Sequence, residues 1–306
     1  MEKKLSNSKI LIVSHISDID GMGSIVLGNL AFKKIDYLLI AVPEQKEALE
    51  FIKSASYEQI YICDIALDDK LGDEINELNL KISHFDHHQS NLYVSKYPFS
   101  TVLTEAFGHP TCGTELFYDE LVKKGLLKPT PAIDTFVELI RSYDTWDWKK
   151  DNNLLAYDLS SFFKTVGPTQ FIKDFTKHLK KAKSFAFSQT QELLINLRKK
   201  EVEEYSANCQ VSVLITNFEG GNAGIVFCDN DASKVGNDLC LNNQIDFALM
   251  LNMQDNVISL RSIREFDVSI IAKKYGGGGH KNAAAFPLTK EYKILFLNLI
   301  VDSLNK

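Results

Sequence analysis

Acids and imidazoles recur in four short segments of the chain, in a pattern that suits metal binding. They are, in chain order, His15 with Asp18 and Asp20, then Asp64, then Asp86-His87-His88, and finally Asp144. Carboxylates and imidazoles without thiolates favour Mn²⁺, Mg²⁺ or iron over a structural zinc ion. Several acids around one point repel one another, and cations relieve that repulsion. Because one carboxylate can bridge two cations, the set predicts a two-metal hydrolase, in which the metals activate a water and hold phosphoryl oxygens.

Each of these residues also has an ordinary structural interpretation. Asp64 could cap the helix that follows it, and Asp18 and Asp20 could shape a turn that Gly21 completes. A histidine such as His15, taken alone, is more often structural than a ligand. The combination favours the metal site, because all four segments fall at the ends of expected strands or helices within one alternating fold.

A second motif is a run of glycines near the end of the chain. It comprises Gly276, Gly277, Gly278 and Gly279, followed by His280 and Lys281. Glycines let a backbone approach a ligand closely and present N–H groups to an anion, and the histidine and lysine add donors. A flexible linker is the alternative interpretation, and the missing Gly-Lys-Ser/Thr ending excludes a Walker loop. Upstream, Arg261 and Ser262 end an expected strand, where Arg261 either binds a phosphate through two hydrogen bonds or is an ordinary surface arginine.

The first half of the chain alternates short apolar runs with segments of helical periodicity. The apolar runs predict strands at residues 9–14, 37–42, 59–64 and 81–85, and helices are expected at residues 24–34, around 45–54 and near 71–79. This alternation indicates an α/β fold with a mainly parallel sheet. Sites in such sheets form at the carboxyl ends of the strands, where three of the four acidic segments fall.

The rest of the chain predicts helices at residues 114–124 and 133–143, the second of which leads to Asp144. A lysine-rich segment from Gln170 to about Tyr205 predicts one long connecting helix, with the lysines on a solvated face. A second α/β pattern follows, with strands at 211–216, 223–228, 247–253 and 257–262 and helices at 232–242 and 267–274. We therefore expect a catalytic domain at 1–185, a connecting helix at 186–207 and a smaller substrate domain at 208–306, with the active site in the cleft between the domains.

Composition narrows the classes of protein and ligand. The 306 residues carry a net charge of −6, which argues against a protein that grips long duplex DNA through its phosphates. No apolar run approaches the roughly 20 residues that cross a bilayer, and the start lacks the apolar core of a signal peptide. Five scattered cysteines without a CxxC pair suit neither a disulfide framework nor a zinc ribbon. We expect a cytoplasmic protein with a small anionic substrate and no membrane partner.

Taken together, these motifs resemble the DHH phosphoesterase family, specifically its DHHA1 subfamily, from Ser14 to about Phe286. The resemblance implies two metal ions, usually manganese. One would be held by His15, Asp18 and Asp64, and the other by Asp20, Asp64, Asp144 and His87. It further implies that His88 faces the substrate and that Asp86 orients its neighbours as the second catalytic residue. The implied substrate-binding residues are Arg261, Ser262, Gly277, Gly278, Gly279 and His280.

The resemblance also indicates which substrates the enzyme would hydrolyse. The chain is similar to the compact nano-RNases and pAp phosphatases, which release mononucleotides from short RNA or DNA oligonucleotides or linear dinucleotides. A pAp phosphatase or polyphosphate hydrolase is the alternative enzyme, and a catalytically silent nucleotide sensor is the alternative of another class. Magnesium or iron could replace manganese as the bound ion. The chain could also form a homodimer.

Overall fold

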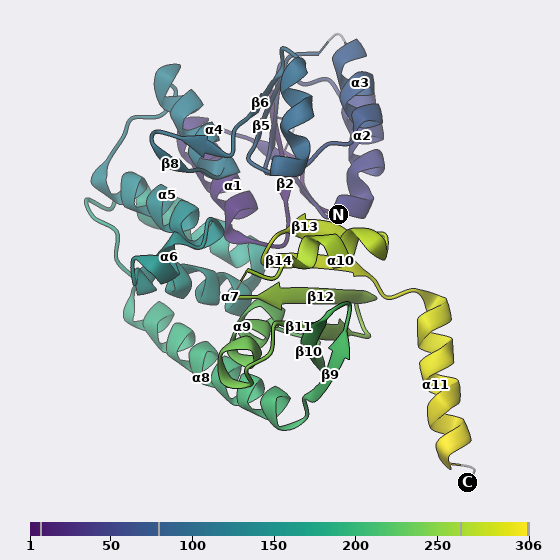
Figure 1. The fold of residues 1–306 in the computed structure, drawn as a ribbon. Helices are drawn as coiled ribbons and strands as arrows, with labels where there is room; N and C mark the ends of the chain where they lie inside the picture. The colour runs from purple at the N-terminus through teal and green to yellow at the C-terminus, as the bar shows by residue number, and fades with distance from the viewer. Residues whose placement is uncertain (7, 79, 264, 305–306) are drawn as a thin grey trace. The chain divides into compact units, whose positions relative to one another are not determined.

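The computed structural model describes residues 1–6, 8–78, 80–263 and 265–304 (Figure 1). The chain divides into two compact units, Met1–Arg198 and Lys199–Lys306, which we call the first and second units and describe separately. No helix of the described residues combines the length and apolar character that crossing a membrane requires. All five cysteines are buried and unbridged.

The first unit is built on a six-stranded sheet with the strand order β1-β3-β2-β4-β5-β6. Its strands are β1 (Glu2–Lys4), β2 (Ile10–His15), β3 (Asp36–Ile40), β4 (Gln59–Cys63), β5 (Ile82–Asp86) and β6 (Ser100–Val102). Every neighbouring pair from β3 to β6 is parallel, and only the edge strand β1 runs antiparallel. The expected parallel sheet is therefore confirmed. Its strands are continuous apolar runs because helices cover both faces.

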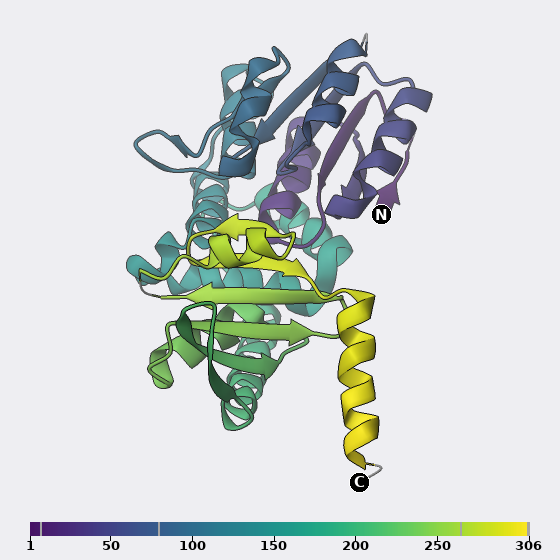
Figure 2. The ribbon, with the colours of Figure 1, turned by 45° about the vertical axis from the view of Figure 1, so that its right-hand side comes forward.

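Alternate strand residues divide the core of the first unit into two layers. Ile12 on β2 joins a cluster with α1 (Ile19–Ala31), α4 (Gly113–Lys123), α5 (Pro131–Asp144) and α7 (Leu154–Leu179). Its neighbours Leu11 and Val13 join a second cluster with α2 (Gln45–Ser54) and α3 (Asp69–Glu77), which lie together over the other face of the sheet (Figure 2). The remaining short elements are η1 (Val42–Glu44), η2 (Gln89–Lys96), the hairpin of β7 (Glu105–Ala106) and β8 (His109–Pro110), and α6 (Asp147–Lys150). Asn79, the last residue of an expected helix, lies outside the described residues.

The prediction of one continuous helix from Gln170 to Tyr205 is wrong. Helix α7 ends at Leu179, and α8 (Gln189–Val211) begins only after a non-helical segment. The break brings Phe185 into the core, where its ring stacks on Phe175 at a centroid distance of 5.8 Å. Ser188 and Gln191 then form a reciprocal cap, since the backbone N–H of Ser188 donates to Oε1 of Gln191 at 2.8 Å and the N–H of Gln191 donates back to Oγ at 3.3 Å.

The second unit contains a mixed six-stranded sheet with the order β13-β14-β12-β11-β10-β9. Its strands are β9 (Leu214–Phe218), β10 (Gly221–Phe227), β11 (Phe247–Asn252), β12 (Val257–Ser262), β13 (Gly278–His280) and β14 (Ala283–Pro287). Helix α9 (Ala232–Asn242) packs on one face through Val235 and Leu239, and α10 (Val268–Lys274) packs on the other through Ile271. Helix α11 (Lys290–Leu304) ends the described chain. The expected strand from Val211 starts later, because Val211 still belongs to α8.

Candidate metal centre and its relatives

The loop between β2 and α1 fixes the first two predicted ligands. His15 ends β2, and Asp18 caps α1 by accepting a hydrogen bond from the backbone N–H of Gly21 at 3.0 Å. Nδ1 of His15 lies 2.8 Å from Oδ2 of Asp18. Gly21 is required here, because a Cβ at that position would lie 1.9 Å from the carbonyl oxygen of His15. Helix α1 begins at Ile19 rather than at the expected residue 24, and this early start places Asp20 in its first turn.

Asp20 is oriented by the start of another helix, far along the chain. Its carboxylate is fully buried and accepts hydrogen bonds from the backbone N–H groups of Gly113 and Thr114, each at 2.7 Å. These two residues open α4, so the free N–H groups and dipole of that helix stabilise the charge. The sequence analysis missed both. The available signal was a glycine and a threonine at the start of an expected helix, which does not show what that helix faces.

Asp64 follows β4 in a left-handed conformation, with a φ of 55°. That conformation costs a non-glycine residue about 1–2 kcal/mol, and the hydrogen bond from its N–H to the carbonyl of Phe85 at 2.9 Å helps to hold it. Oδ1 of Asp64 lies 3.6 Å from Nε2 of His87, and Oδ2 lies 4.0 Å from Nδ1 of His15. The two oxygens of one carboxylate therefore face two different histidines.

His87 lies among three carboxylates that come from three separate elements. Its Nε2 is 3.3 Å from Oδ2 of Asp144 at the end of α5, 3.6 Å from Asp64 and 3.8 Å from Oδ2 of Asp20. All six predicted metal ligands are thus brought together. Within each of three overlapping groups, the candidate ligand atoms lie within 4.8 Å of one another. The groups are His15 with Asp18 and Asp64, Asp20 with His87 and Asp144, and Asp64 with Asp86, His87 and His88.

Asp86 and His88 form a pair beside this cluster. Asp86 is fully buried at the end of β5, and its Oδ1 lies 2.7 Å from Nδ1 of His88. Its other oxygen accepts a hydrogen bond from the side-chain amide of Asn91, a residue that the sequence analysis did not single out. Burial opposes charge on His88, but the hydrogen bond and charge of Asp86 prevail and raise its pKa to about 9. His88 also lines a cavity of about 110 Å³ together with His15 and Asp64.

The electrostatics of the cluster fit divalent cations. Burial, with the charges of Asp20 and Asp18 added, raises the pKa of Asp64 well above its ordinary value. Burial likewise raises the pKa of Asp144 to about 7, against the opposing charge of His87. Oδ2 of Asp64 and Oδ2 of Asp144 are both buried with no hydrogen-bond partner among the described residues. Crowded carboxylates with unpaired oxygens, next to imidazoles and without thiolates, are a donor set that suits Mn²⁺, Mg²⁺ or iron.

The predicted substrate residues lie in the second unit, along one edge of its sheet. Arg261 on β12 and His280 on β13 both pair with Ala283 of the strand between them. Directly opposed residues project to the same face, so Arg261 and His280 share one face of the sheet. The guanidinium of Arg261 donates to Oγ of Ser233 at 2.7 Å. Ser262 is engaged within the fold, because its hydroxyl donates to the carbonyl of Phe266 at 2.8 Å.

The glycine run is partly an edge strand rather than a free loop. Gly278 and Gly279 belong to β13, which pairs with β14. A Cβ on Gly277 would lie 2.0 Å from the carbonyl oxygen of Ala285, and one on Gly279 would lie 2.6 Å from that of Ala283. Close strand packing therefore requires these two glycines, whereas Gly278 has open space beside it. Anion binding by the run stays a prediction.

Comparisons with known proteins identify relatives in sequence and in fold. The DHHA1 domain family matches residues 208–306. Oligoribonuclease NrnB of Bacillus subtilis (strain 168) is 30% identical over 298 residues, which cover 94% of this chain and 74% of that protein. Among solved structures, a pGpG-specific phosphodiesterase, PggH from Vibrio cholerae, aligns with a TM-score of 0.56 at 13% identity and covers 97% of this chain and 98% of its own. An exopolyphosphatase-related protein from Bacteroides fragilis aligns with a TM-score of 0.54 at 16% identity, with coverages of 95% and 91%.

The two structural likenesses support the fold alone, and the family assignment rests on the sequence relationships. The match to NrnB extends over almost the whole chain, and the domain match covers most of the second unit. The triplet Asp86-His87-His88 lies at the carboxyl end of β5, beside the other acids of the cluster. The chain therefore belongs to the DHH phosphoesterase family, in its DHHA1 subfamily, and is a phosphoesterase.

Proposed function

We propose that this phosphoesterase uses two divalent cations, preferably Mn²⁺, to hydrolyse short oligonucleotides or linear dinucleotides to mononucleotides. The observation that carries the proposal is the position of Asp64, whose two oxygens face the two separate ligand groups. The substrate class is supported by NrnB, which is named an oligoribonuclease and is similar to this chain over nearly its full length.

The ligand groups assign the residues that would hold each cation. His15, Asp18 and Asp64 would hold one, and Asp20, His87 and Asp144 would hold the other. Asp64 would also contribute to the second cation, because its Oδ1 lies 3.6 Å from Nε2 of His87. When bound, the cations would neutralise the crowded carboxylates, lower the pKa of a water and polarise the phosphoryl group. Asp20 remains oriented by the N–H groups at the start of α4, so its carboxylate is positioned before any ion arrives.

His88 is the chain's own candidate for proton transfer. Because Nδ1 of His88 bonds to Asp86, the proton that can reach a ligand is the one on Nε2. Asp86 is held in turn by Asn91, which fixes the orientation of the imidazole. His88 would donate this proton to a phosphate oxygen or to the leaving oxygen of the substrate. Arg261 and His280, on one face of the second sheet, would bind a terminal phosphate.

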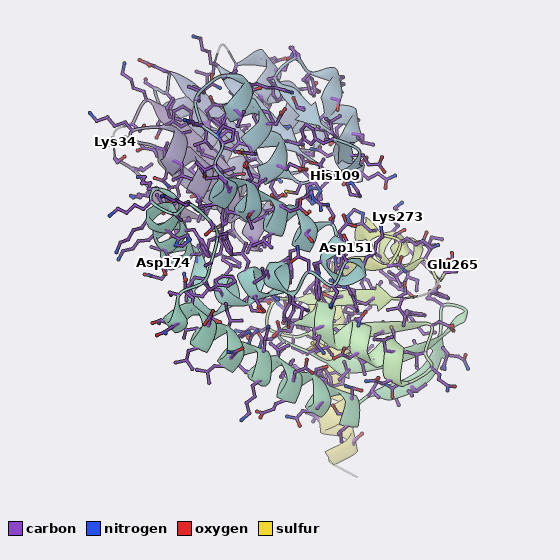
Figure 3. The ribbon with its side chains drawn as sticks, turned by 90° about the vertical axis from the view of Figure 1, so that its left-hand side faces the viewer. Lys34, His109, Asp151, Asp174, Glu265 and Lys273 are labelled. Carbon is purple, nitrogen blue, oxygen red and sulfur yellow. The ribbon has the colours of Figure 1, made fainter. Side chains whose placement is uncertain are left out.

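Digestion of end-labelled RNAs of graded length, from the dinucleotide upward, tests the proposal. With Mn²⁺ present, the dinucleotide should be hydrolysed to mononucleotides faster than longer strands, and faster than pAp or polyphosphate in parallel assays. Asp64→Ala should abolish the activity, because the two oxygens of Asp64 face both ligand groups. The matched control is Asp151→Ala, which changes an exposed acid of the same unit (Figure 3) and should retain full activity.

The same assays separate the alternatives. Faster hydrolysis of pAp or polyphosphate than of the dinucleotide would identify a small-phosphate hydrolase instead. Absence of turnover on every substrate, with Mn²⁺, Mg²⁺ and Fe²⁺ each supplied, would favour a catalytically silent nucleotide sensor. Full activity of the Asp64→Ala protein on a dinucleotide would refute the assigned site.

A further inference from the structure

A lysine-lined groove lies in the first unit, between α7, the end of α1, the edge strand β1 and its neighbour β3. Its charged lining consists of Lys4, Lys173, Lys177 and Lys180, and Tyr37 and Thr176 also border it. The groove has a volume of about 470 Å³, within the range of roughly 300–1,000 Å³ typical of small-molecule sites. We propose that it binds an oligophosphate group, as a second anion site separate from the metal centre.

The charge of the groove is the first argument. Lys173, Lys177 and Lys180 recur at the spacing that places them on one face of α7, and Lys4 faces them from β1. No acid lines the groove, and among the described residues none of these four lysines has an ion pair within 4.0 Å. Compensation of the helix dipole would account for lysines in the last turn of α7, but not for Lys173 or for a lysine on a strand. In a chain with a net charge of −6, this concentration of positive charge points to an anionic ligand.

The acids nearest in sequence to this lining form no ion pair with its lysines among the described residues. Glu2, on the same strand as Lys4, accepts a hydrogen bond from Thr169, which also borders the groove. Asp174, which follows Lys173 and is labelled at the surface in Figure 3, accepts from Gln170 at 2.8 Å and lines a neighbouring groove. Neither carboxylate forms an ion pair with the lysines among the described residues, so the groove remains positively charged.

Thr176, which borders the groove, has a hydroxyl that no other described residue satisfies. Oγ1 of Thr176 is buried and without a hydrogen bond among the described residues. In the part of α7 that precedes its kink at Gly167, Ser161 and Thr165 each donate to the carbonyl four residues earlier, at 2.9 and 2.8 Å. A helical threonine normally satisfies its hydroxyl in this way. The hydrogen-bonding capacity of the Thr176 hydroxyl is therefore unused, and rotation about χ1 would turn it toward a ligand next to the lysines.

The groove is distant from the metal centre. Helix α1 carries Asp20 in its first turn and Asn29, which lines the groove, near its other end. Their separation of nine positions corresponds to about 13 Å along the helix axis. On the sheet, Lys4 pairs with Tyr37, whereas His15 pairs with Ile40 at the carboxyl end of the same strand β3. Changes to the lysines therefore leave the proposed metal ligands untouched.

The residues that line the groove indicate which class of ligand it would bind. Ammonium groups act as point charges that attract phosphate, whereas base recognition in single-stranded nucleic acids uses exposed aromatic rings. The aromatic residue of the groove, Tyr37, is only 4% exposed and offers no stacking surface. The stripe from Lys173 to Lys180 extends about 10 Å along α7, longer than one phosphate. The ligand is thus several phosphates in a row, either an inorganic oligophosphate or the oligophosphate tail of a nucleotide.

Calorimetric titration of the full-length protein with tripolyphosphate, ATP and orthophosphate, in buffer with a chelator, tests this proposal. The triple variant Lys173→Gln/Lys177→Gln/Lys180→Gln should bind tripolyphosphate at least about tenfold more weakly than the unsubstituted protein. The control triple variant Lys70→Gln/Lys81→Gln/Lys128→Gln removes the same charge from exposed lysines outside the groove and should bind normally. Thr176→Val, which removes only the hydroxyl, should weaken binding a few-fold. Hydrolysis of a dinucleotide should be unchanged in all of these variants.

The possible results are distinct from those that test the catalytic function. Equal affinity of the two triple variants would overturn the proposal, as would orthophosphate binding as tightly as tripolyphosphate. ATP binding as tightly as tripolyphosphate would support it and identify a nucleotide tail as the natural source. Much weaker binding of ATP would support it and identify an inorganic oligophosphate. Failure of the dinucleotide assay with intact tripolyphosphate binding would refute the proposed function alone.

Discussion

Oδ1 of Asp64 lies 3.6 Å from Nε2 of His87, while the other oxygen of the same carboxylate faces His15 at 4.0 Å. Asp64 reaches this position because its backbone is left-handed. The start of α4 also packs closely against it, which is possible because Gly113 has no Cβ to collide with Asp64. The geometry of the candidate metal centre therefore depends on backbone packing as much as on its side chains.

Gly113→Ala should damage the site without changing a ligand. The added Cβ would lie 2.9 Å from both the backbone nitrogen and the Cβ of Asp64, and Gly113 also donates its N–H to Asp20. We expect affinity for Mn²⁺ and kcat to fall by about 10–100-fold, the loss typical when a group that supports a metal ligand is displaced. Metal titration and dinucleotide hydrolysis measure the two effects.

Gly125→Ala is the control for that substitution. Gly125 has a φ of 66° just after α4 and open space around it, so an alanine there costs about 1–2 kcal/mol of folding stability but touches no ligand. Its kcat and metal affinity should match the unsubstituted protein below the melting temperature. Equal loss of activity in the two variants would mean that Gly113 acts only through global stability.

Asn91→Ala should impair catalysis more than metal binding. Its amide is a hydrogen-bond donor to the buried Asp86, which in turn orients His88. Without that donor we expect kcat on a dinucleotide to fall about tenfold, the lower end of the effect of removing an outer hydrogen-bond partner, with the affinity for Mn²⁺ nearly unchanged. Gln89→Ala, on the same short helix but exposed, should be neutral. An Asn91→Ala protein with unchanged kcat would remove the support for this role.

The buried imidazole of His84 should make the folding stability depend on pH. It is fully buried, and burial lowers its pKa below the ordinary value of 6.5. Its Nε2–H donates to the carbonyl of Ile65 at 2.8 Å, and its Nδ1 lies 2.8 Å from Oγ of Ser100. As the pH falls through 6.5 the unfolded chain binds a proton that the folded chain does not, so the free energy of unfolding should decrease as the pH falls from 6.5 towards the folded pKa.

His84→Gln should remove this part of the pH dependence. Below pH 6.5 the unfolding free energy of the unsubstituted protein should fall more steeply than that of the variant, by up to about 1.4 kcal/mol per pH unit. Above pH 7.5 the difference between the two proteins should be constant. Urea denaturation between pH 5 and 8 in the presence of a chelator gives the measurement, and parallel curves over the whole range would contradict the prediction.

Much of the fold and of the metal cluster could be predicted from the sequence because their signals are local. Apolar runs such as that of β2 end directly at a candidate ligand, and parallel strands bring their carboxyl ends to one edge. The placement of His15, Asp64 and His87 within one cluster follows from that rule. Two helices of the second unit were also predicted closely, since α9 matches the expected residues 232–242 and α10 begins one residue after the expected 267–274, whereas α11 was not expected.

What the sequence left unpredicted depends on contacts between distant segments. Gly113 lies 93 residues from the carboxylate that it orients, and nothing local to it identifies that partner. The break between α7 and α8 arises because Phe185 packs on Phe175, which overrides helical propensity in the segment before Ser188. The pairing of β13 with β14 likewise turns part of the glycine run into a strand, against the weak strand propensity of glycine.

Equilibrium binding of Mn²⁺ to the chelator-treated protein tests the central claim most directly. The account predicts two Mn²⁺ per chain. Asp64→Asn should weaken both binding events, because the two oxygens of Asp64 face His15 of one ligand group and His87 of the other. Asp18→Asn should weaken one event and Asp144→Asn the other, because each belongs to one group. Binding of a single ion, or an Asp64→Asn protein that still binds two Mn²⁺ with unchanged affinity, would contradict it.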